Sequence, residues 1–238
     1  MDGMTELLRD LVIANRILAR EGVVDAFGHV SVRHPQKPDR YIMSHSRAPE
    51  LITRDDLIEF TLEGESDGLQ GRTPYGERMI HGAVFERRPE VNAVIHNHAY
   101  ELIPFGVTGA PIRPIMHTCG VIGSDIPTWD IRTRFGCTDH LVVTMEQGRD
   151  LAESLGERRV ALMKRHGCVI AGRSLREAVN IAVYLQVNAR IQLQALQLGT
   201  PDFLTPEETE KCSARQMSPL GLDRAWEYWC VRAGADKL

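Results

Sequence analysis

The sequence predicts a mixed α/β fold, on three observations. Short segments in which apolar and polar residues alternate, as in half-buried strands, stand between longer segments with helical periodicity. The 238 residues suffice to bury a core without disulfides or a structural metal. The chain has no internal repeat and no low-complexity linker, so we expect a single domain over 1–238. The order of the strands in the sheet does not follow from these patterns.

The first part of the chain predicts one helix and a cluster of strands. Apolar residues at helical spacing run over about 5–20, and Gly22 ends this helix. Strand-like runs follow, with a Pro-rich turn between the first two and a Gly-rich turn after the third. These runs are 27–33, 41–43 and 57–61.

A helix start is predicted at Thr73-Pro74, with Thr at the N-cap and Pro at the first helical position. This helix carries Glu77 in its first turn and ends near Arg88-Pro89. Further apolar runs predict strands at 91–98, 111–116, 141–144 and 160–164, with a continuation at 169–171.

Two helices and a tail complete the prediction. One helix spans about 148–155, and a capping box of Ser174 and Glu177 opens a long helix that ends at about Leu198. The tail, about 201–238, is rich in Pro and charge and holds a group of aromatic residues. These are Trp226, Tyr228 and Trp229. We expect the tail to pack against a neighbouring surface, and the sequence does not say whose.

Composition excludes several classes of function. The net charge is -4 and no stripe of Lys or Arg is interleaved with aromatic residues, so we expect no nucleic-acid partner. No apolar stretch approaches the roughly 20 residues that span a bilayer, so we expect no membrane partner. The five cysteines are scattered without a CxxC pair, and the first residues lack the basic-then-apolar order of a secretion signal. We therefore expect a cytoplasmic protein with reduced thiols.

Histidines supply the strongest chemical signal. His96 and His98 are two apart on a predicted strand, so both imidazoles point to the same face. His166 follows a buried run, where the chain leaves the sheet and the ring can face a cleft. Three His with one open position form the ligand set of a catalytic zinc site. Spacing alone also fits two structural histidines, and it neither supports nor forbids a meeting with His166.

Glu77 allows two interpretations. A Glu in the first turn of a helix stabilises the helix dipole, and this requires no further function. Beside a cation, the same carboxyl group would be a fourth ligand that the substrate displaces, or a general acid/base.

Three separated motifs resemble the class II aldolase/adducin family, in the same order and with similar spacing from about residue 5 to 199. They are Thr73-Pro74 with Glu77 and His81, the run from Arg88 to Ala99 around His96-Asn97-His98, and Arg165-His166-Gly167. The resemblance implies the fold of fuculose-phosphate aldolase, a single three-layer α/β/α domain around a central, mainly antiparallel sheet. Residues 200–238 would then be a C-terminal extension.

The same resemblance implies a metal-dependent lyase. His96, His98 and His166 would bind a divalent metal, Zn2+ first and Mn2+, Co2+ or Fe2+ as alternatives, and Glu77 would be the catalytic acid/base. Family members usually assemble as homotetramers with active sites at subunit contacts. His117 lies near where family aldolases place a Tyr that serves the adjacent subunit's site as proton donor. We expect His117 to act in its own or a neighbouring site, with an interface residue as the other interpretation.

The sequence departs from the family where aldolases hold a substrate phosphate. The family's Gly-Asn turn reads Gly28-His29, its Thr-Gly region falls within 44–47, and its Ser-Ser pair before the Glu reads Tyr75-Gly76. His and Tyr fill a pocket that needs small donors, so we expect a substrate without phosphate. The remaining groups suit a carboxylate, unless the two arginines are surface cations. The expected substrate-binding residues are His29, Ser44, His45, Arg47, Arg72 and Tyr75.

These expectations lead to one function and two alternatives. The chain resembles the family's decarboxylases of aromatic catabolism, which act on dihydroxyphthalate or on dienoates from ring cleavage. We expect a decarboxylase of a non-phosphorylated hydroxy/keto polycarboxylate, through a metal-stabilised enolate that Glu77 or His117 protonates. The alternative is a class II aldolase for a free hydroxy-keto acid or sugar. An adducin-like, non-enzymatic interaction protein ranks behind both, because all three His and Glu77 are retained.

Overall fold

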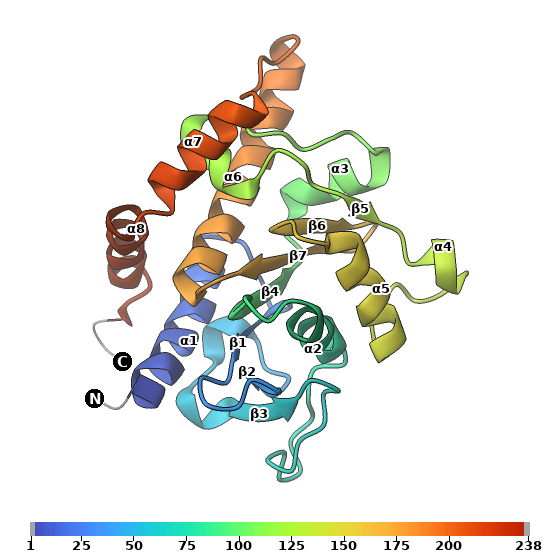
Figure 1. The fold of residues 1–238 in the computed structure, drawn as a ribbon, viewed down its shortest axis with the longest axis vertical. Coiled ribbons are helices and arrows are strands. Elements are labelled where there is room, and N and C mark those ends of the chain that lie inside the picture. Colours follow the sequence, from blue (N-terminus) through green and yellow to red (C-terminus); the bar gives the residue numbers. More distant parts are fainter. Residues whose placement is uncertain (1–2, 236–238) are drawn as a thin grey trace.

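One seven-stranded sheet organises the computed structural model, which describes residues 3–235 (Figure 1). Its strands are β1 (His29–Arg33), β2 (Arg40–Ser44), β3 (Leu57–Thr61), β4 (Ala93–Asn97), β5 (Thr128–Trp129), β6 (Val160–Met163) and β7 (Gly167–Gly172). They lie in the order β3-β2-β1-β4-β7-β6-β5, and all neighbours are antiparallel except β5 and β6. The mixed α/β class and the mainly antiparallel sheet are therefore confirmed.

Helices cover both faces of the sheet and make three layers, α/β/α (Figure 1). The outer layers contain α1 (Gly3–Arg20) and α6 (Leu175–Leu198) on one face, and α2 (Arg78–Arg87) and α5 (Met145–Leu155) on the other. Successive residues of a strand point to opposite faces. On β4, Ile95 therefore joins the core beneath α1 and α6, and Val94 joins the core beneath α2 and α5. His96, the candidate ligand on β4, shares the face of Val94.

The remaining helical segments lie around these layers. They are η1 (Pro49–Leu51), η2 (Arg54–Asp56), η3 (Tyr100–Leu102), α3 (Ile103–Thr108), η4 (His117–Ile122), α4 (Arg132–Phe135), α7 (Pro206–Gln216) and α8 (Pro219–Arg232). α6 begins as predicted, because Ser174 accepts a hydrogen bond from the Glu177 N–H at 3.2 Å. α5 begins earlier than predicted, because Thr144 and Gln147 form a capping box. The run predicted to continue after 160–164 instead turns, and β6 and β7 pair as a hairpin.

The predicted helix start at Thr73-Pro74 is wrong. α2 begins at Arg78, and residues 72–75 are irregular. The Ser46 N–H donates to the Thr73 carbonyl at 2.8 Å, and the Tyr75 hydroxyl contacts the backbone of Arg47. These contacts hold the segment beside the end of β2, so it cannot join the helix. Glu77 consequently precedes α2 as its N-cap residue.

The strand predicted at 111–116 is also absent, because side chains of α6 take the place of a partner strand. Asn188 accepts from the Ile115 N–H at 2.9 Å and donates to the Arg113 carbonyl at 2.9 Å. Gln192 accepts from the Arg113 N–H and donates to the Pro111 carbonyl in the same way. The apolar pattern reflects burial without pairing in a sheet.

Replacing Asn188 with Ala should lower the free energy of unfolding by about 2–4 kcal/mol, because it leaves two backbone groups of the 111–116 segment unpaired. Asn180→Ala is the matched control. Asn180 lies on the same helix and is equally buried, and neither of its amide atoms has a hydrogen-bond partner within residues 3–235. The control should stay within about 1 kcal/mol of the wild type. Urea denaturation measures both; equal losses would remove the proposed anchoring role.

The strand predicted at 141–144 is irregular, for a similar reason. The Val142 N–H donates to Glu77 Oε1 at 3.0 Å, and the N–H groups of Val143 and Thr144 donate to Gln147 Oε1 at 2.9 and 3.1 Å. Carboxylate and amide oxygens thus satisfy this backbone instead of a neighbouring strand.

The C-terminal tail packs on its own chain. α7 contacts η4 and α8 contacts α6 and α1 along one side of the molecule (Figure 1). Trp226 and Trp229 are buried in the core beneath α1 and α6, whereas Tyr228 is exposed. The neighbouring surface that the aromatic group predicted is therefore this subunit's own. No helix within residues 3–235 is long and apolar enough to cross a membrane.

Candidate metal centre

Three imidazoles and one carboxylate converge beside the end of β4. Glu77, His96, His98 and His166 each present a ligand atom, and these atoms lie within 4.8 Å of one another. His98 Nε2 is 2.9 Å from His96 Nε2 and 3.1 Å from His166 Nε2. Glu77 Oε2 lies 3.5 Å from His96 Nε2 and 3.4 Å from His166 Nε2. The four side chains that the sequence singled out thus form one cluster.

The three histidines come from two parts of the sheet, the end of β4 and the turn between β6 and β7. His96 lies on β4 on the face of Val94, and His98 follows just after the strand ends, on the same side. His166 lies in the turn between β6 and β7, where Arg165 has a φ of 65°. The turn runs close to β4: a Cβ at Gly167 would lie 2.1 Å from the Asn97 carbonyl oxygen. Glycine at this position therefore lets the turn bring His166 to the end of β4.

Backbone carbonyls fix the orientation of two of the rings. His96 Nδ1 is 3.0 Å from the Cys168 carbonyl, and His166 Nδ1 is 2.9 Å from the His140 carbonyl. A carbonyl only accepts, so each Nδ1 carries the proton and each Nε2 presents a lone pair to the cluster. Orienting a ligand through its other nitrogen is typical of metal-binding His. The donor set of three imidazoles and one carboxylate fits a divalent cation.

Electrostatics favour the same interpretation. Burial and the neighbouring His96 and His166 lower the pKa of His98 to about 4, so its imidazole is neutral at physiological pH. Burial raises the pKa of Glu77, but the His96 and His166 imidazoles outweigh this and hold its pKa well below the ordinary value. A neutral imidazole, as at His98, and an ionised carboxylate, as at Glu77, are protonation states that metal ligands require.

A cavity of about 380 Å³ opens onto the cluster. Glu77 and His98 line it, together with His29, Arg47 and Tyr75 from the predicted substrate site. The remaining lining is mostly small or apolar: Ala26, Phe27, Gly28, Ser46, Ala48, Gly76 and Leu141. The cavity is therefore apolar along much of its wall, and Arg47 is the one arginine among its lining residues.

Three of the predicted substrate-binding residues do not line this cavity. His45 Nε2 is hydrogen-bonded to Asp56 Oδ1 at 2.9 Å. Ser44 is buried at the end of β2. Arg72 donates to the carbonyls of Leu69, Asp55 and Gly68 and so holds the turn before Tyr75. These contacts give Arg72 a structural role.

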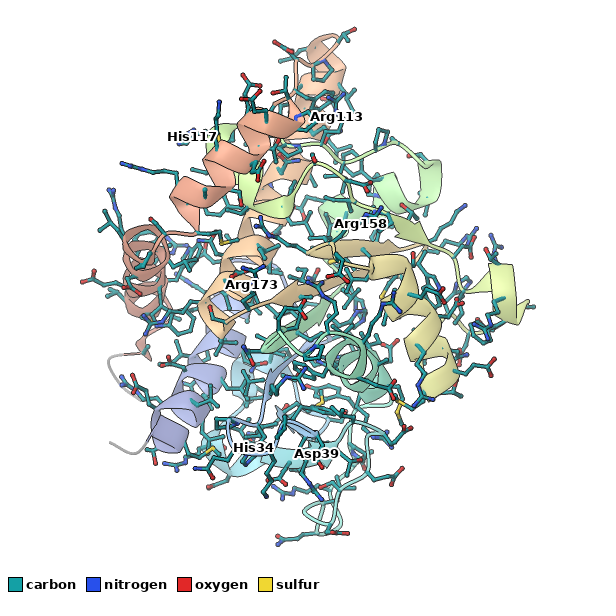
Figure 2. The ribbon with its side chains drawn as sticks, viewed as in Figure 1. His34, Asp39, Arg113, His117, Arg158 and Arg173 are labelled. Carbon is teal, nitrogen blue, oxygen red and sulfur yellow. The ribbon has the colours of Figure 1, made fainter. Side chains whose placement is uncertain are left out.

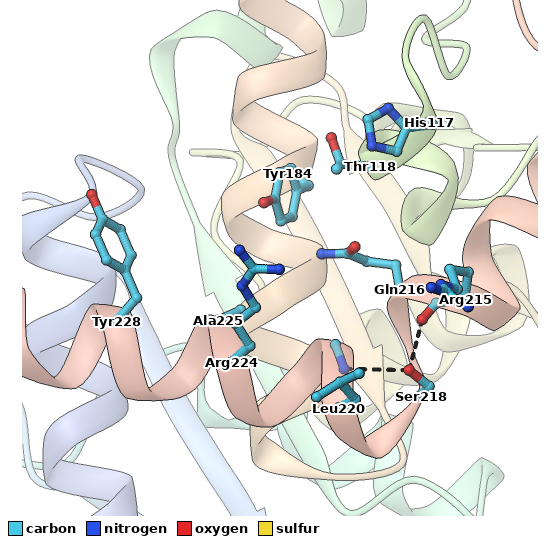
Figure 3. Close-up of a pocket in the computed structure, with 11 residues that line it drawn as sticks. His117, Thr118, Tyr184, Arg215, Gln216, Ser218, Leu220, Arg224, Ala225 and Tyr228 are labelled. Atoms are coloured by element: carbon cyan, nitrogen blue, oxygen red, sulfur yellow. Dashed lines mark hydrogen bonds between the residues drawn. The ribbon is translucent and has the colours of Figure 1, made fainter.

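His117 lies elsewhere, on η4, which packs against α7; Figure 2 shows it at the upper left of the molecule. It lines a separate cavity of about 530 Å³ between η4, α6 and the tail, with Tyr184, Arg215 and Arg224 (Figure 3). This cavity shares no lining residue with the one at the cluster. Within its own subunit, His117 is thus separated from the candidate metal centre.

Sequence reasoning assigned no role to two buried residues near the centre, Ser31 and His81, although His81 belongs to one of the family motifs. His81 Nε2 is 2.6 Å from His29 Nδ1, and Ser31 Oγ is 2.6 Å from His81 Nδ1. Signals for both existed: Ser31 shares the strand face of His29, and His81 stands one helical turn after Glu77.

The comparisons with known proteins agree with this architecture. The family model described as the Class II Aldolase and Adducin N-terminal domain matches residues 9–193. The chain belongs to this family. The resemblance inferred from the three motifs is thereby confirmed.

The relatives of the chain within the family include decarboxylases and aldolases. Decarboxylase tropJ of Talaromyces stipitatus is 31% identical over 247 residues, which cover 93% of this chain and 92% of that protein. The 3,4-dihydroxyphthalate decarboxylase of a Terrabacter species is 27% identical, over 98% of this chain and 100% of that protein. The solved structure of L-fuculose 1-phosphate aldolase from Glaciozyma antarctica PI12 is similar in fold, with a TM-score of 0.78 at 23% identity, over 96% and 90% of the two chains. These family members are lyases, and this chain is a class II aldolase-like lyase.

Proposed function

We propose that this lyase is a decarboxylase of a non-phosphorylated hydroxy/keto polycarboxylate, such as a dihydroxyphthalate or a dienoate from ring cleavage. The convergence of His96, His98, His166 and Glu77 at the mouth of a cavity is the observation that carries the proposal. Decarboxylase tropJ, at 31% identity over 93% of this chain, supports this reaction over aldol cleavage.

The three histidines would hold the metal, with Zn2+ as the proposed ion because its preferred ligands include imidazole nitrogen. When bound, a divalent cation supplies a Lewis acid for the negative charge that develops on a substrate oxygen as the C–C bond breaks. Glu77 lies between the three histidines and the Val142 N–H. The Val142 N–H donates to Glu77 Oε1 and so orients the carboxylate. Glu77 would act as the acid/base beside the reacting carbon, or as a ligand that the substrate displaces.

The walls of the cavity support a carboxylate rather than a phosphate. The rings of His29 and Tyr75 lie 4.6 Å apart, at sequence positions where the family resemblance implies small donors in the aldolases. Arg47 lines the cavity and is held by Asp56 through Nη1 at 2.8 Å, an arrangement that orients the guanidinium. Arg binds a carboxylate bidentately. We propose His29, Arg47 and Tyr75 as the residues that contact substrate.

His117 would complete the site from a neighbouring subunit. Its separation from the candidate centre in its own chain favours that arrangement over action within one subunit. The proposal therefore includes a homo-oligomer, a tetramer as is usual in the family, with sites at subunit contacts. The five unpaired cysteines accord with a reducing cytoplasm as its location.

A substrate panel tests the proposed reaction. The metal-loaded protein is offered dihydroxyphthalates, ring-cleavage dienoates, free hydroxy-keto acids, sugars and sugar phosphates, and release of CO2 and of aldehyde is measured. We expect CO2 from the aromatic or dienoate acids, with kcat/KM at least about 100-fold above that for sugar phosphates, or about 3 kcal/mol. Aldehyde release from a free hydroxy-keto acid or sugar would favour the aldolase alternative. Turnover of sugar phosphates above all others would refute the argument from the cavity walls.

A further inference from the structure

Ser31, His81 and His29 form a buried hydrogen-bonded chain that ends at the cavity. Ser31 and His81 are fully buried, and His29 is 4% exposed. Ser31 and His29 lie on β1, and His81 lies on α2, one turn after the helix begins. The two contacts that join them are both 2.6 Å long. These hydrogen bonds thus connect the buried Ser31 to His29, which lines the cavity at the candidate metal centre.

The need to pair every buried hydrogen-bond donor determines which group donates and which accepts in each of these two contacts. Within residues 3–235, His81 Nδ1 is the only hydrogen-bond partner of the Ser31 hydroxyl. If the hydroxyl accepted from His81, its own proton would be buried without an acceptor, which costs about 1–3 kcal/mol. The hydroxyl therefore donates to His81 Nδ1. His81 must then carry its proton on Nε2, and it donates that proton to His29 Nδ1.

The hydrogen bond from His81 determines which ring nitrogen of His29 carries the proton. Because Nδ1 accepts from His81, the proton of neutral His29 is on Nε2, the nitrogen on the opposite edge. An imidazole that accepts a hydrogen bond at Nδ1 cannot carry a proton there, so His29 is neutral in this arrangement. His29 lines the cavity beside Glu77 and His98, and Nε2 has no hydrogen-bond partner among the described residues. A neutral N–H donor thus faces the space where the substrate would lie.

We propose that His29 donates a hydrogen bond from Nε2 to the substrate oxygen on which negative charge develops, and that Ser31 and His81 are positioning residues that keep the proton on that nitrogen. The proposal rests on the proposed function for the existence of such an oxygen. The proton stays on His29 throughout, so the three residues neither gain nor lose one. A donor already oriented in a buried site stabilises the developing charge without reorganisation.

The test combines nuclear magnetic resonance with kinetics on the zinc-loaded protein. Correlation of the imidazole 15N and 1H resonances identifies which nitrogen of His29 is protonated. We expect protonated Nε2 and unprotonated Nδ1 in the wild type. Ser31→Ala should let both rings populate the other tautomer and lower kcat roughly 10-fold, with KM changed less than about 3-fold, because part of the donor's contribution is lost. Ser31→Thr, which keeps the hydroxyl, should restore the wild-type tautomer and kcat.

Each of the other possible results would contradict one particular part of the proposal. Protonated Nδ1 on wild-type His29 would overturn the direction of the chain. A Ser31→Ala protein with the wild-type tautomer and kcat would overturn the positioning role, and one with a shifted tautomer and unchanged kcat would overturn the donor role. Thermal unfolding of both variants controls for lost folding. If the wild type turns over no acid or sugar in the panel, the proposed function fails, while the resonance measurement still decides the tautomer.

Discussion

Replacing His98 with Ala should abolish metal binding and reduce turnover by roughly 10³-fold or more, since Lewis-acid stabilisation worth several kcal/mol is lost. His98 Nε2 approaches both other imidazoles, at 2.9 and 3.1 Å, so its removal leaves His96 and His166 as a pair. Metal content per chain, measured by mass spectrometry of the purified protein, should fall from about one equivalent to below about 0.1.

His34→Ala is the matched control for that variant. His34 is also a buried histidine, but its Nδ1 accepts from the backbone N–H groups of Gln36 and Lys37, away from the cluster. The control should keep its metal even if it loses some stability. Full metal occupancy in His98→Ala would show that this histidine is not a ligand.

Glu77→Gln should separate metal binding from catalysis. Glutamine keeps an oxygen that can accept from the Val142 N–H, now 3.0 Å from Glu77 Oε1, so the backbone at 141–144 should stay in place. The three histidines are untouched, so metal content should remain near one equivalent. Turnover should fall by roughly 10²–10⁴-fold, the range that a lost acid/base group costs.

Glu77→Ala serves as the comparison. It removes both oxygens, so it should lose turnover and also destabilise the 141–144 segment, with a lower unfolding temperature than Glu77→Gln. A Glu77→Gln protein with wild-type kcat would exclude Glu77 as the acid/base. A Glu77→Gln protein without metal would instead make the carboxylate an indispensable ligand.

Local patterns predicted most of the fold because the relevant forces are local. Capping by Ser174 and the apolar run that forms β4 depend on residues a few positions apart, and both were predicted. The errors occurred where distant side chains satisfy the backbone. Asn188 and Gln192 replace a partner strand for 111–116, and Glu77 does so at Val142. An apolar run indicates burial, but it does not say which group receives the backbone hydrogen bonds.

In the candidate site, too, local sequence patterns predicted some features, whereas others depend on tertiary contacts. The spacing of His96 and His98 placed two rings on one face, whereas only the family motifs related His166 to them. The distinction between Arg47, which lines the cavity, and Arg72, whose donors hold a turn, depends on tertiary contacts. The Ser31–His81 contact joins a strand to a helix 50 positions later, so no local pattern could reveal it.

Anomalous X-ray scattering from crystals of the zinc-loaded protein, recorded above and below the zinc absorption edge, would locate the bound metal. We expect one strong zinc peak per chain, within bonding distance of Nε2 of His96, His98 and His166 and beside the Glu77 carboxylate. Crystals in which the three rings point apart, or in which the only zinc peak lies elsewhere on the chain, would contradict this expectation.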